Sequence, residues 1–207
     1  GFESVSWRGL RIRNPDDDPP DWILSELVVP VLPFPCAGPT TLLRHEGYVH
    51  AYCVEDSERH EVYLLRWSES DFIAGDLEDP EWSTGSGWAS TDPEALFDEG
   101  AADFTVSHDP FRDHFVLVQG LGYSGGFLAD SLALRIASGV EGPFPKSDPF
   151  YSPPEIQVPE VVANSVRTHP QFGGADLIAT YIASADLDQV RADPEIYYPR
   201  FLKLRFR

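Results

Sequence analysis

The sequence predicts an all-β fold in which short antiparallel sheets are arranged radially, as the blades of a β-propeller. Short runs that alternate apolar and polar residues, rich in β-branched and aromatic side chains, indicate strands. Gly and Pro separate these runs and indicate turns. A unit of such runs is repeated along the chain, and repetition of this kind is typical of a radial array.

The clearest copy of the unit lies between Asp103 and Phe144. A first run ends at a His-Asp-Pro turn, a second run covers residues 114–119, and a glycine-rich loop leads to a third run at residues 131–137. Related stretches precede and follow this copy. We therefore expect the inner strands of successive blades at residues 40–44, 103–107 and 164–168.

Each copy carries a histidine at its first turn and an arginine in its third run. The histidines are 63 and 61 residues apart, and the arginines 69 and 70. These residues are His45, His108 and His169, with Arg66, Arg135 and Arg205. We expect the histidines to form turn or inter-blade hydrogen bonds rather than to be ligands or catalytic groups. The arginines are expected to bridge neighbouring strands or blades.

The repeat predicts a single partial propeller domain over residues 1–207 with about three blades. Residues 1–35 would be the outer strands of a preceding blade, and the blades would cover residues 36–100, 101–158 and 159–207. The last would be a closing blade with three strands. Closed propellers have four blades or more, so we expect part of a five-bladed propeller. Its other blades would lie before Gly1 or come from a second chain or fragment.

Composition supports a folded β protein. Hydrophobic residues make up 42% and aromatic residues 13% of the 207 positions. Nineteen Pro and 16 Gly fit many turns and disfavour long helices, so only residues 93–100 and 186–192 are expected to allow a short helix. The net charge of −19 would repel nucleic acid and an anionic membrane surface, so we expect neither as a partner. An acidic, soluble, secreted protein is expected.

The two cysteines, Cys36 and Cys53, flank a predicted hairpin that turns near Glu46. In that hairpin residue 53 would face about residue 39, which brings the two cysteines close together. Either a disulfide or two buried small apolar side chains would fit. No further Cys or His accompanies them as a zinc site requires, and residues 16–18 indicate a solvated turn rather than a calcium loop. No metal or cofactor is therefore expected.

Polar residues stand at or near the start of each predicted inner strand: Thr40, Asp103 and Asn164. The rest of each strand is largely apolar. In a propeller these positions would form a ring at one mouth of the central channel, where a polyhydroxylated ligand could bind. The alternative is that they cap strand ends or bind channel water.

Loops that follow the second strands should reach the same face. They contain Glu55, Asp56, Tyr123 and the pair Tyr197–Tyr198, which we expect to contribute to substrate binding. Aromatic faces stack on sugar rings, and paired carboxylates perform acid/base chemistry at a glycosidic centre.

The segment LALRIASGVEGPF at residues 132–144 resembles a strand and Gly-Pro-aromatic signature of five-bladed β-propeller glycoside hydrolases of the arabinanase/β-xylosidase type. The tail, with THPQFGGADLIATYIAS and YYPRFLKLRF, resembles the closing blade of related propellers that include endo-D-arabinanases. The resemblance covers about residues 40–207.

The resemblance implies a set of carboxylates at the channel mouth, the first of them on a first blade that would precede Gly1. Asp103 begins an inner strand, as such catalytic carboxylates do. Glu155, in the Pro-Pro-Glu loop before the last blade, is the second candidate. No catalytic motif of the family surrounds Asp103, and Pro-rich linkers such as the one around Glu155 often carry an incidental acid.

Two functions fit these observations. One is a secreted glycoside hydrolase-like propeller that cleaves a pentose- or furanose-rich polysaccharide with two carboxylates. The alternative is a non-catalytic propeller that binds carbohydrate or another protein. A polysaccharide or oligosaccharide is the expected partner in the first case. Two acids within about 10 Å of each other would favour hydrolysis over binding alone.

Overall fold

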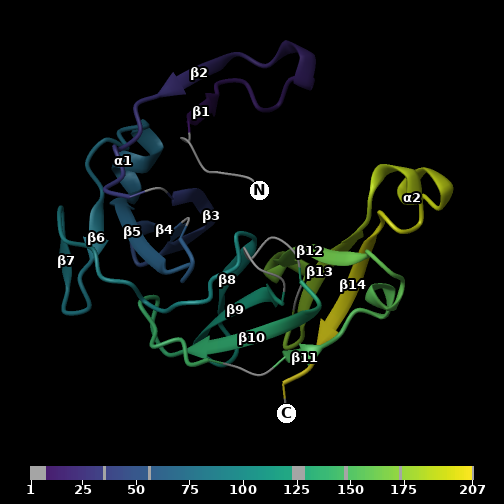
Figure 1. Ribbon diagram of the computed structural model, residues 1–207. Coiled ribbons are helices and arrows are strands. Elements are labelled where there is room, and N and C mark those ends of the chain that lie inside the picture. The colour runs from purple at the N-terminus through teal and green to yellow at the C-terminus, as the bar shows by residue number, and fades with distance from the viewer. Residues whose placement is uncertain are drawn as a thin grey trace. The chain divides into compact units, whose positions relative to one another are not determined.

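The computed structural model describes residues 8–34, 36–55, 57–122, 129–146, 149–172 and 174–206. The described chain is all-β, with four antiparallel sheets and only short helices (Figure 1). It divides into two compact units, one of residues 1–56 and 63–95 and the other of residues 57–62 and 96–207. In the part of the chain that is described, no helix is long and apolar enough to cross a membrane.

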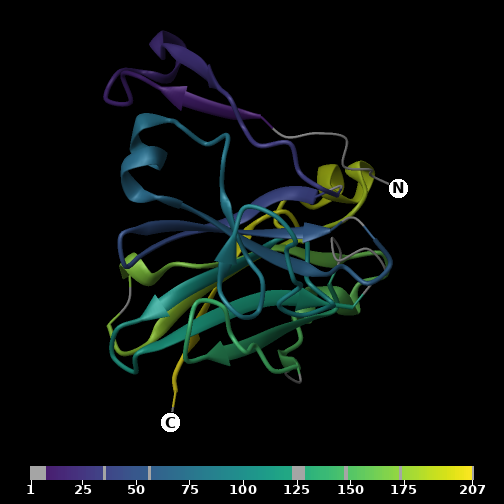
Figure 2. The same cartoon turned by 90° about the vertical axis from the view of Figure 1, so that its left-hand side faces the viewer.

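The first unit contains a two-stranded hairpin and a five-stranded sheet. The hairpin pairs β1 (Gly9–Ile12) with β2 (Leu24–Leu27), and both are drawn in purple in Figure 2. The strands of the sheet follow chain order: β3 (Cys36–His45), β4 (Tyr48–Glu55), β5 (Val62–Ser68), β6 (Glu81–Ser83) and β7 (Trp88–Ala89). The hairpin lies within residues 1–35, where outer strands of a preceding blade were predicted.

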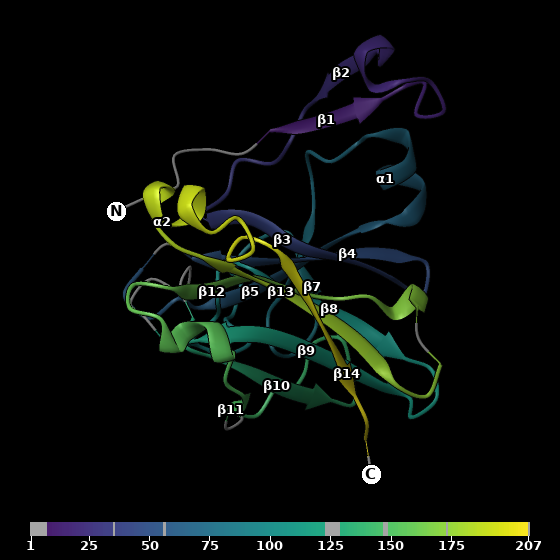
Figure 3. The same ribbon diagram turned by 90° about the vertical axis from the view of Figure 1, so that its right-hand side faces the viewer.

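The second unit contains two sheets, seen side-on in Figure 3. One has four strands: β8 (Phe104–Asp109), β9 (His114–Leu121), β10 (Ser131–Ala137) and β11 (Pro149–Tyr151). The other has three: β12 (Val162–Thr168), β13 (Leu177–Ser184) and β14 (Pro199–Leu204). Short 3₁₀ helices occur at η1 (Pro19–Asp21), η2 (Pro154–Gln157) and η3 (Pro170–Phe172).

The predicted inner strands correspond to β3, β8 and β12, each of which is the first strand of its sheet. Each sheet then continues with its next strand in the sequence, as propeller blades do. The sheet of the first unit has five strands, because β7 adds to its outer edge. This strand arises because residues 84–87 form a turn in which the Thr84 amide donates to the Gly87 carbonyl at 2.9 Å.

Helix placement differs in part from the sequence prediction. The predicted helix at residues 186–192 is present as α2 (Leu187–Ala192), capped by the Asp186 side chain. Residues 93–100 form no helix, because the amides of Leu96 and Glu99 donate to carbonyls of the 59–62 segment. A helix that was not predicted, α1 (Glu69–Ala74), begins at the Ser68 cap and ends at Gly75, whose φ of +83° suits glycine.

Each unit has a hydrophobic core of its own. In the first unit Trp67, Trp82 and Leu65 pack with the two cysteines. In the second, Val118, Val166 and Tyr181 pack between the two sheets. Buried and partly buried residues alternate along most of β12 and β13, which places one face of their sheet in this core, as expected for a half-buried strand.

Cys36 and Cys53 form a disulfide across the β3–β4 hairpin, with Cα atoms 5.9 Å apart. Pro39 lies opposite Cys53 in the register, as predicted from the position of the turn. Both cysteines are buried in the core of the first unit. The structure therefore decides between the two alternatives in favour of the disulfide.

Arg66 on β5 is held between two aromatic rings. Its guanidinium carbon lies 3.9 Å from the centroid of Tyr48 and 3.9 Å from that of Trp88. Its Nε donates to Glu81 at 2.9 Å. The buried ring of His50 lies next to this group, 5.5 Å from the Trp88 ring. Arg66 thus bridges strands of its own sheet, as expected for the arginine series.

Reduction of the disulfide should lower the free energy of unfolding of the first unit. The bond closes a chain separation of 17 residues, and a loop of this size contributes about 3 kcal/mol by restricting the unfolded chain. Urea unfolding with and without reductant measures the difference. In the Cys36→Ala, Cys53→Ala variant the reductant should have no effect; a shift of equal size there would contradict the assignment.

His50 should make the protein sensitive to acid. Burial, together with the charge of Arg66, lowers its pKa to about 4, so between pH 6.5 and 4 the unfolded chain takes up a proton that the folded chain does not. The free energy of unfolding should fall by up to about 3 kcal/mol over this range and level off below it. His50→Phe should flatten this part of a urea-unfolding series, whereas His114→Gln, at an exposed site, should not.

Candidate active site around Asp103

The strand registers of the second unit bring several strand ends together. Phe104 lies opposite Gln119, and Val162 lies opposite Ser184, so the starts of β8 and β12 adjoin the ends of β9 and β13. This end of the two sheets is called the Asp103 end below. The turns that carry His108 and His169 lie at the opposite end, called the histidine end.

Asp103 immediately precedes β8, and its carboxylate is bound from β12. Arg167 donates to Oδ1 at 2.6 Å and to the Phe104 carbonyl at 3.0 Å. Ser165 Oγ donates to Oδ2 at 3.4 Å. The Asp103 side chain is 37% exposed, so it is fixed in direction while remaining open to solvent.

A β-bulge explains why β12 can reach Asp103. The register of β12 against β13 shifts between Asn164 and Arg167, and Ser165 has a φ of +51°. A left-handed backbone is uncommon for a residue other than glycine, and bulges redirect side chains near functional sites. Here the bulge gives the side chains of Ser165 and Arg167 a common direction towards Asp103.

Three hydroxyl groups connect β8 to β12 beyond Asp103. The Thr168 amide and its Oγ1 both donate to Thr105 Oγ1 at 2.8 Å. Thr168 Oγ1 also lies 3.3 Å from Ser107 Oγ. These contacts join β8 to β12 and fix the strands that carry Arg167 and follow Asp103.

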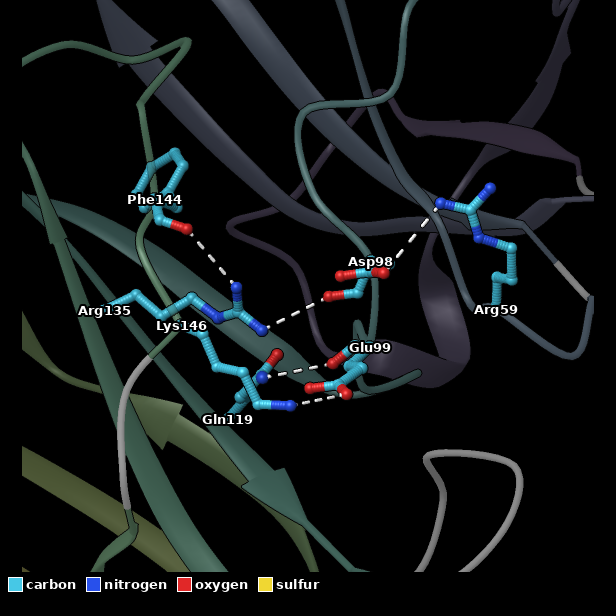
Figure 4. A network of polar contacts seen from close by, with 7 residues as sticks. All are labelled: Arg59, Asp98, Glu99, Gln119, Arg135, Phe144 and Lys146. Atoms are coloured by element: carbon cyan, nitrogen blue, oxygen red, sulfur yellow. Dashed lines mark hydrogen bonds and ion pairs between the residues drawn. The ribbon is translucent and has the colours of Figure 1, made fainter.

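The loop that leads into Asp103 is held by buried polar side chains (Figure 4). Gln119 is fully buried; its amide donates to the Glu99 carbonyl at 3.2 Å and accepts from the Ala101 amide at 3.3 Å. Arg135 donates to the carbonyls of Asp98 and Phe144 at 3.2 and 3.3 Å. The loop thus arrives at Asp103 already ordered, which is what a preorganised site needs.

Glu155 belongs to a second group of contacts. It lies on η2 and accepts from Tyr181 Oη and Arg200 Nε, both at 2.8 Å. Burial alone would raise its pKa, but the hydrogen bonds from Tyr181 and Arg200 lower it. Burial, with the neighbouring Tyr151 and Glu155, raises the pKa of Tyr181, which therefore stays protonated as the donor.

The two candidate catalytic carboxylates therefore contact different partners: Asp103 is bound by Ser165 and Arg167, and Glu155 by Tyr181 and Arg200. Both are held by an arginine. A carboxylate with a lowered pKa suits the role of a base or of an orienting group, whereas a proton donor requires a raised pKa. Glu155 does not have the environment of a proton donor.

The other predicted site residues that the structure describes lie in both units. Asn164 is half-buried in β12 beside the bulge, and Tyr198 is 63% exposed just before β14. Thr40 in β3 and Glu55 at the end of β4 belong to the first unit, whereas Asp103 belongs to the second. Asp56 and Tyr123 lie outside the described residues. Within the described residues, no group of three or more His, Cys, Asp and Glu could hold a metal ion.

The repeated histidines have the local contacts expected of turn residues. His45 ends β3, His108 lies in the last part of β8 and His169 follows β12. His108 Nε2 lies 3.1 Å from Asp113, and His169 Nε2 lies 2.8 Å from Thr180 Oγ1.

The two carboxylates are held by Ser165, Arg167, Tyr181 and Arg200, none of which was predicted from the sequence. A partner for Arg167 could have been predicted, because a charged residue in a strand that faces other strands needs a partner of opposite charge. The bulge carried no such signal in the sequence.

Comparison with known proteins adds information on the fold. No protein-family profile and no curated protein sequence matches the chain. Among solved structures, one match is a "putative hydrolase" from Bacteroides ovatus ATCC 8483, 15% identical, with a TM-score of 0.59 over 82% of this chain and 45% of that chain. Another is a thermostable family-43 glycoside hydrolase, 14% identical, with a TM-score of 0.41 over 80% of this chain and 54% of that chain.

The first of these likenesses shows that the chain shares its fold with part of the Bacteroides ovatus protein. At 15% identity it shows the fold alone, and the chain spans less than half of that protein's length. The second likeness is too weak to carry an argument.

Removing the Tyr181 hydroxyl should destabilise the second unit. Tyr181→Phe leaves Glu155 with one donor fewer in a partly buried place, and a hydrogen bond to a charged group contributes about 1.5–3 kcal/mol. The cost in the free energy of unfolding should shrink below the pKa of Glu155, because the protonated carboxyl no longer needs the donor. Tyr198→Phe, at an exposed ring, serves as the control for urea unfolding and should change little. Equal costs in both variants would contradict the role of the Tyr181 hydroxyl.

Proposed function

We propose that this chain forms part of a glycoside hydrolase-like β-propeller that acts on a pentose- or furanose-rich polysaccharide. The observation that carries the proposal is the Asp103 carboxylate, oriented by Arg167 and Ser165 at the end of the sheets where β8 begins. The antiparallel sheets and the fold shared with a larger protein named as a hydrolase support it.

In this mechanism Asp103 is the ionised carboxylate that activates water or attacks the sugar. Arg167, Ser165 and the ordered loop before Asp103 fix the direction of the carboxylate, and its side chain stays 37% exposed. A second carboxyl group, with a raised pKa, protonates the leaving oxygen. Glu155 suits an orienting role, because the hydrogen bonds from Tyr181 and Arg200 favour its ionised form. The proton donor then comes from a part of the protein other than Glu155.

Sugar binding would involve an aromatic and an amide group at the Asp103 end of the second unit. Tyr198 has an exposed ring just before β14, and Asn164 lies next to the bulge that turns towards Asp103. We also propose that Thr40, Glu55, Asp56 and Tyr123 contribute to polysaccharide binding. Stacking of sugar C–H groups on a tyrosine ring and hydrogen bonds to an amide are the usual means of binding a polyol.

Completion of the propeller would require further polypeptide. The three-stranded sheet ends at β14, which pairs with β13 on one side in the described structure. We propose that a strand from another part of the protein, or from a second chain, adds to this edge. We also propose that the protein is secreted, because disulfides persist in oxidising compartments.

The alternative is a propeller that binds carbohydrate without cleaving it. One observation favours it: each candidate carboxylate already has an arginine partner, so neither is isolated for proton donation. Under this alternative Asp103 would accept hydrogen bonds from sugar hydroxyls.

Asp103→Asn in the complete protein tests between the two. If Asp103 is catalytic, cleavage of arabinan or xylan should fall by at least a hundredfold, the range for loss of a general acid/base group, while oligosaccharide binding measured by calorimetry is retained. The loss of the half-exposed ion pair with Arg167 costs about 1 kcal/mol or less, which is too little to explain such a fall by unfolding.

Asp188→Asn is a matched control, since Asp188 is a highly exposed carboxylate on α2. It should leave the rate of cleavage unchanged. Equal cleavage by Asp103→Asn and the parent would remove Asp103 from the catalytic set. Retained binding without any cleavage by the parent would favour the binding protein.

A further inference from the structure

A second candidate ligand site lies at the histidine end of the second unit, away from Asp103. A cavity of about 130 Å³ opens between the β8–β9 turn and the loop that leads into β13. Two contacts join its walls: Thr168 to Ser107, and Arg112 to the Ala175 carbonyl at 3.0 Å. The cavity is therefore formed by two fixed chain segments.

Hydrogen-bonding groups line the cavity. Asp109, Asp176 and His108 are on its walls, with Ser107 at the end nearer β12. Burial alone would raise the pKa of Asp109, but Arg112 and the Phe111 amide lower it, and the ammonium of Lys203 lowers the pKa of Asp176. Both carboxylates are thus ionised acceptors at neutral pH.

The negative charges of Asp109 and Asp176 are already balanced by cationic side chains that lie outside the cavity. Arg112 donates to Asp109 at 2.7 Å, and Lys203 donates to Asp176 at 2.7 Å, while neither cation lines the cavity. A cationic ligand would compete with these partners, and an anionic one would meet carboxylates. A neutral ligand that donates hydroxyl hydrogens to carboxylates is the chemistry that fits.

Apolar surface completes the cavity. Val116 is buried at its base, and Pro110 and Leu177 also line it. Phe111 also lines the cavity, and 63% of its surface is exposed. An aromatic ring on the wall of a cavity with hydrogen-bonding groups gives a ligand apolar surface beside polar contacts.

We propose that this cavity is a second sugar-binding subsite, which takes one neutral sugar ring of the same polysaccharide and anchors the chain away from the reacting bond. The ring would pack against Phe111 and Pro110 and donate hydroxyl hydrogens to Asp109 and Asp176. The proposal rests on the proposed function for its ligand class. It assigns to Phe111 and Asp176 a role in polymer binding and none in bond cleavage.

Phe111→Ala in the complete protein is the test, with two measurements. Binding to insoluble arabinan and xylan, measured by co-sedimentation, should weaken about tenfold, which corresponds to about 1.4 kcal/mol. Turnover of a small nitrophenyl arabinofuranoside or xyloside, which occupies only the reacting site, should be unchanged. Asp176→Asn should weaken polymer binding in the same direction.

Phe172→Ala is the matched control, because Phe172 is 66% exposed on the neighbouring η3 but does not line the cavity. It should bind both polymers as the parent does. Unchanged binding by Phe111→Ala, or equal weakening by Phe111→Ala and Phe172→Ala, would overturn the subsite while leaving hydrolysis at Asp103 untouched. If the parent binds polymer through Phe111 but cleaves nothing, hydrolysis fails and the subsite stands.

Discussion

The second unit depends on Arg167, a side chain of β12 that binds the carboxylate of Asp103 and the carbonyl of Phe104 on the neighbouring sheet. Without it, the first strands of the two sheets would be joined mainly by the hydroxyl contacts of Thr168. The pair is too exposed to contribute much stability. Its importance is geometric, because it fixes both the spacing of the strands and the direction of the carboxylate.

Local features of the fold could be predicted from the sequence. Alternation with a period of two identified the first strands, and the position of the turn at Glu46 placed Cys53 opposite Pro39. Helix α1 was missed because its acidic residues resemble a solvated insertion, although Ser68 and Gly75 cap it. Residues 93–100 were misjudged because their backbone bonds to residues 59–62, which no local pattern reports.

The positions of the candidate residues relative to the strands could be predicted, but their contacts could not. Asp103 was selected because it precedes an inner strand, and this depends only on the strand pattern. Its contact with Arg167 joins residues 64 positions apart and requires a bulge at Ser165, so no short-range signal contains it. In the same way, the position of Glu155 before the last sheet could be predicted. The hydrogen bonds that lower its pKa could not, because they come from distant residues on β13 and β14.

The two aromatic rings around Arg66 should make its contacts insensitive to ionic strength. Its guanidinium contacts two rings at 3.9 Å and is only 17% exposed. Mobile ions screen charges that are far apart in solvent, over a Debye length of about 8 Å at physiological salt, but act weakly on a contact this short and shielded. Added salt would meanwhile relieve the repulsion among 34 acidic residues that face only 15 basic ones. The contacts of Arg66 that join β4, β6 and β7 should therefore weaken little as salt is added.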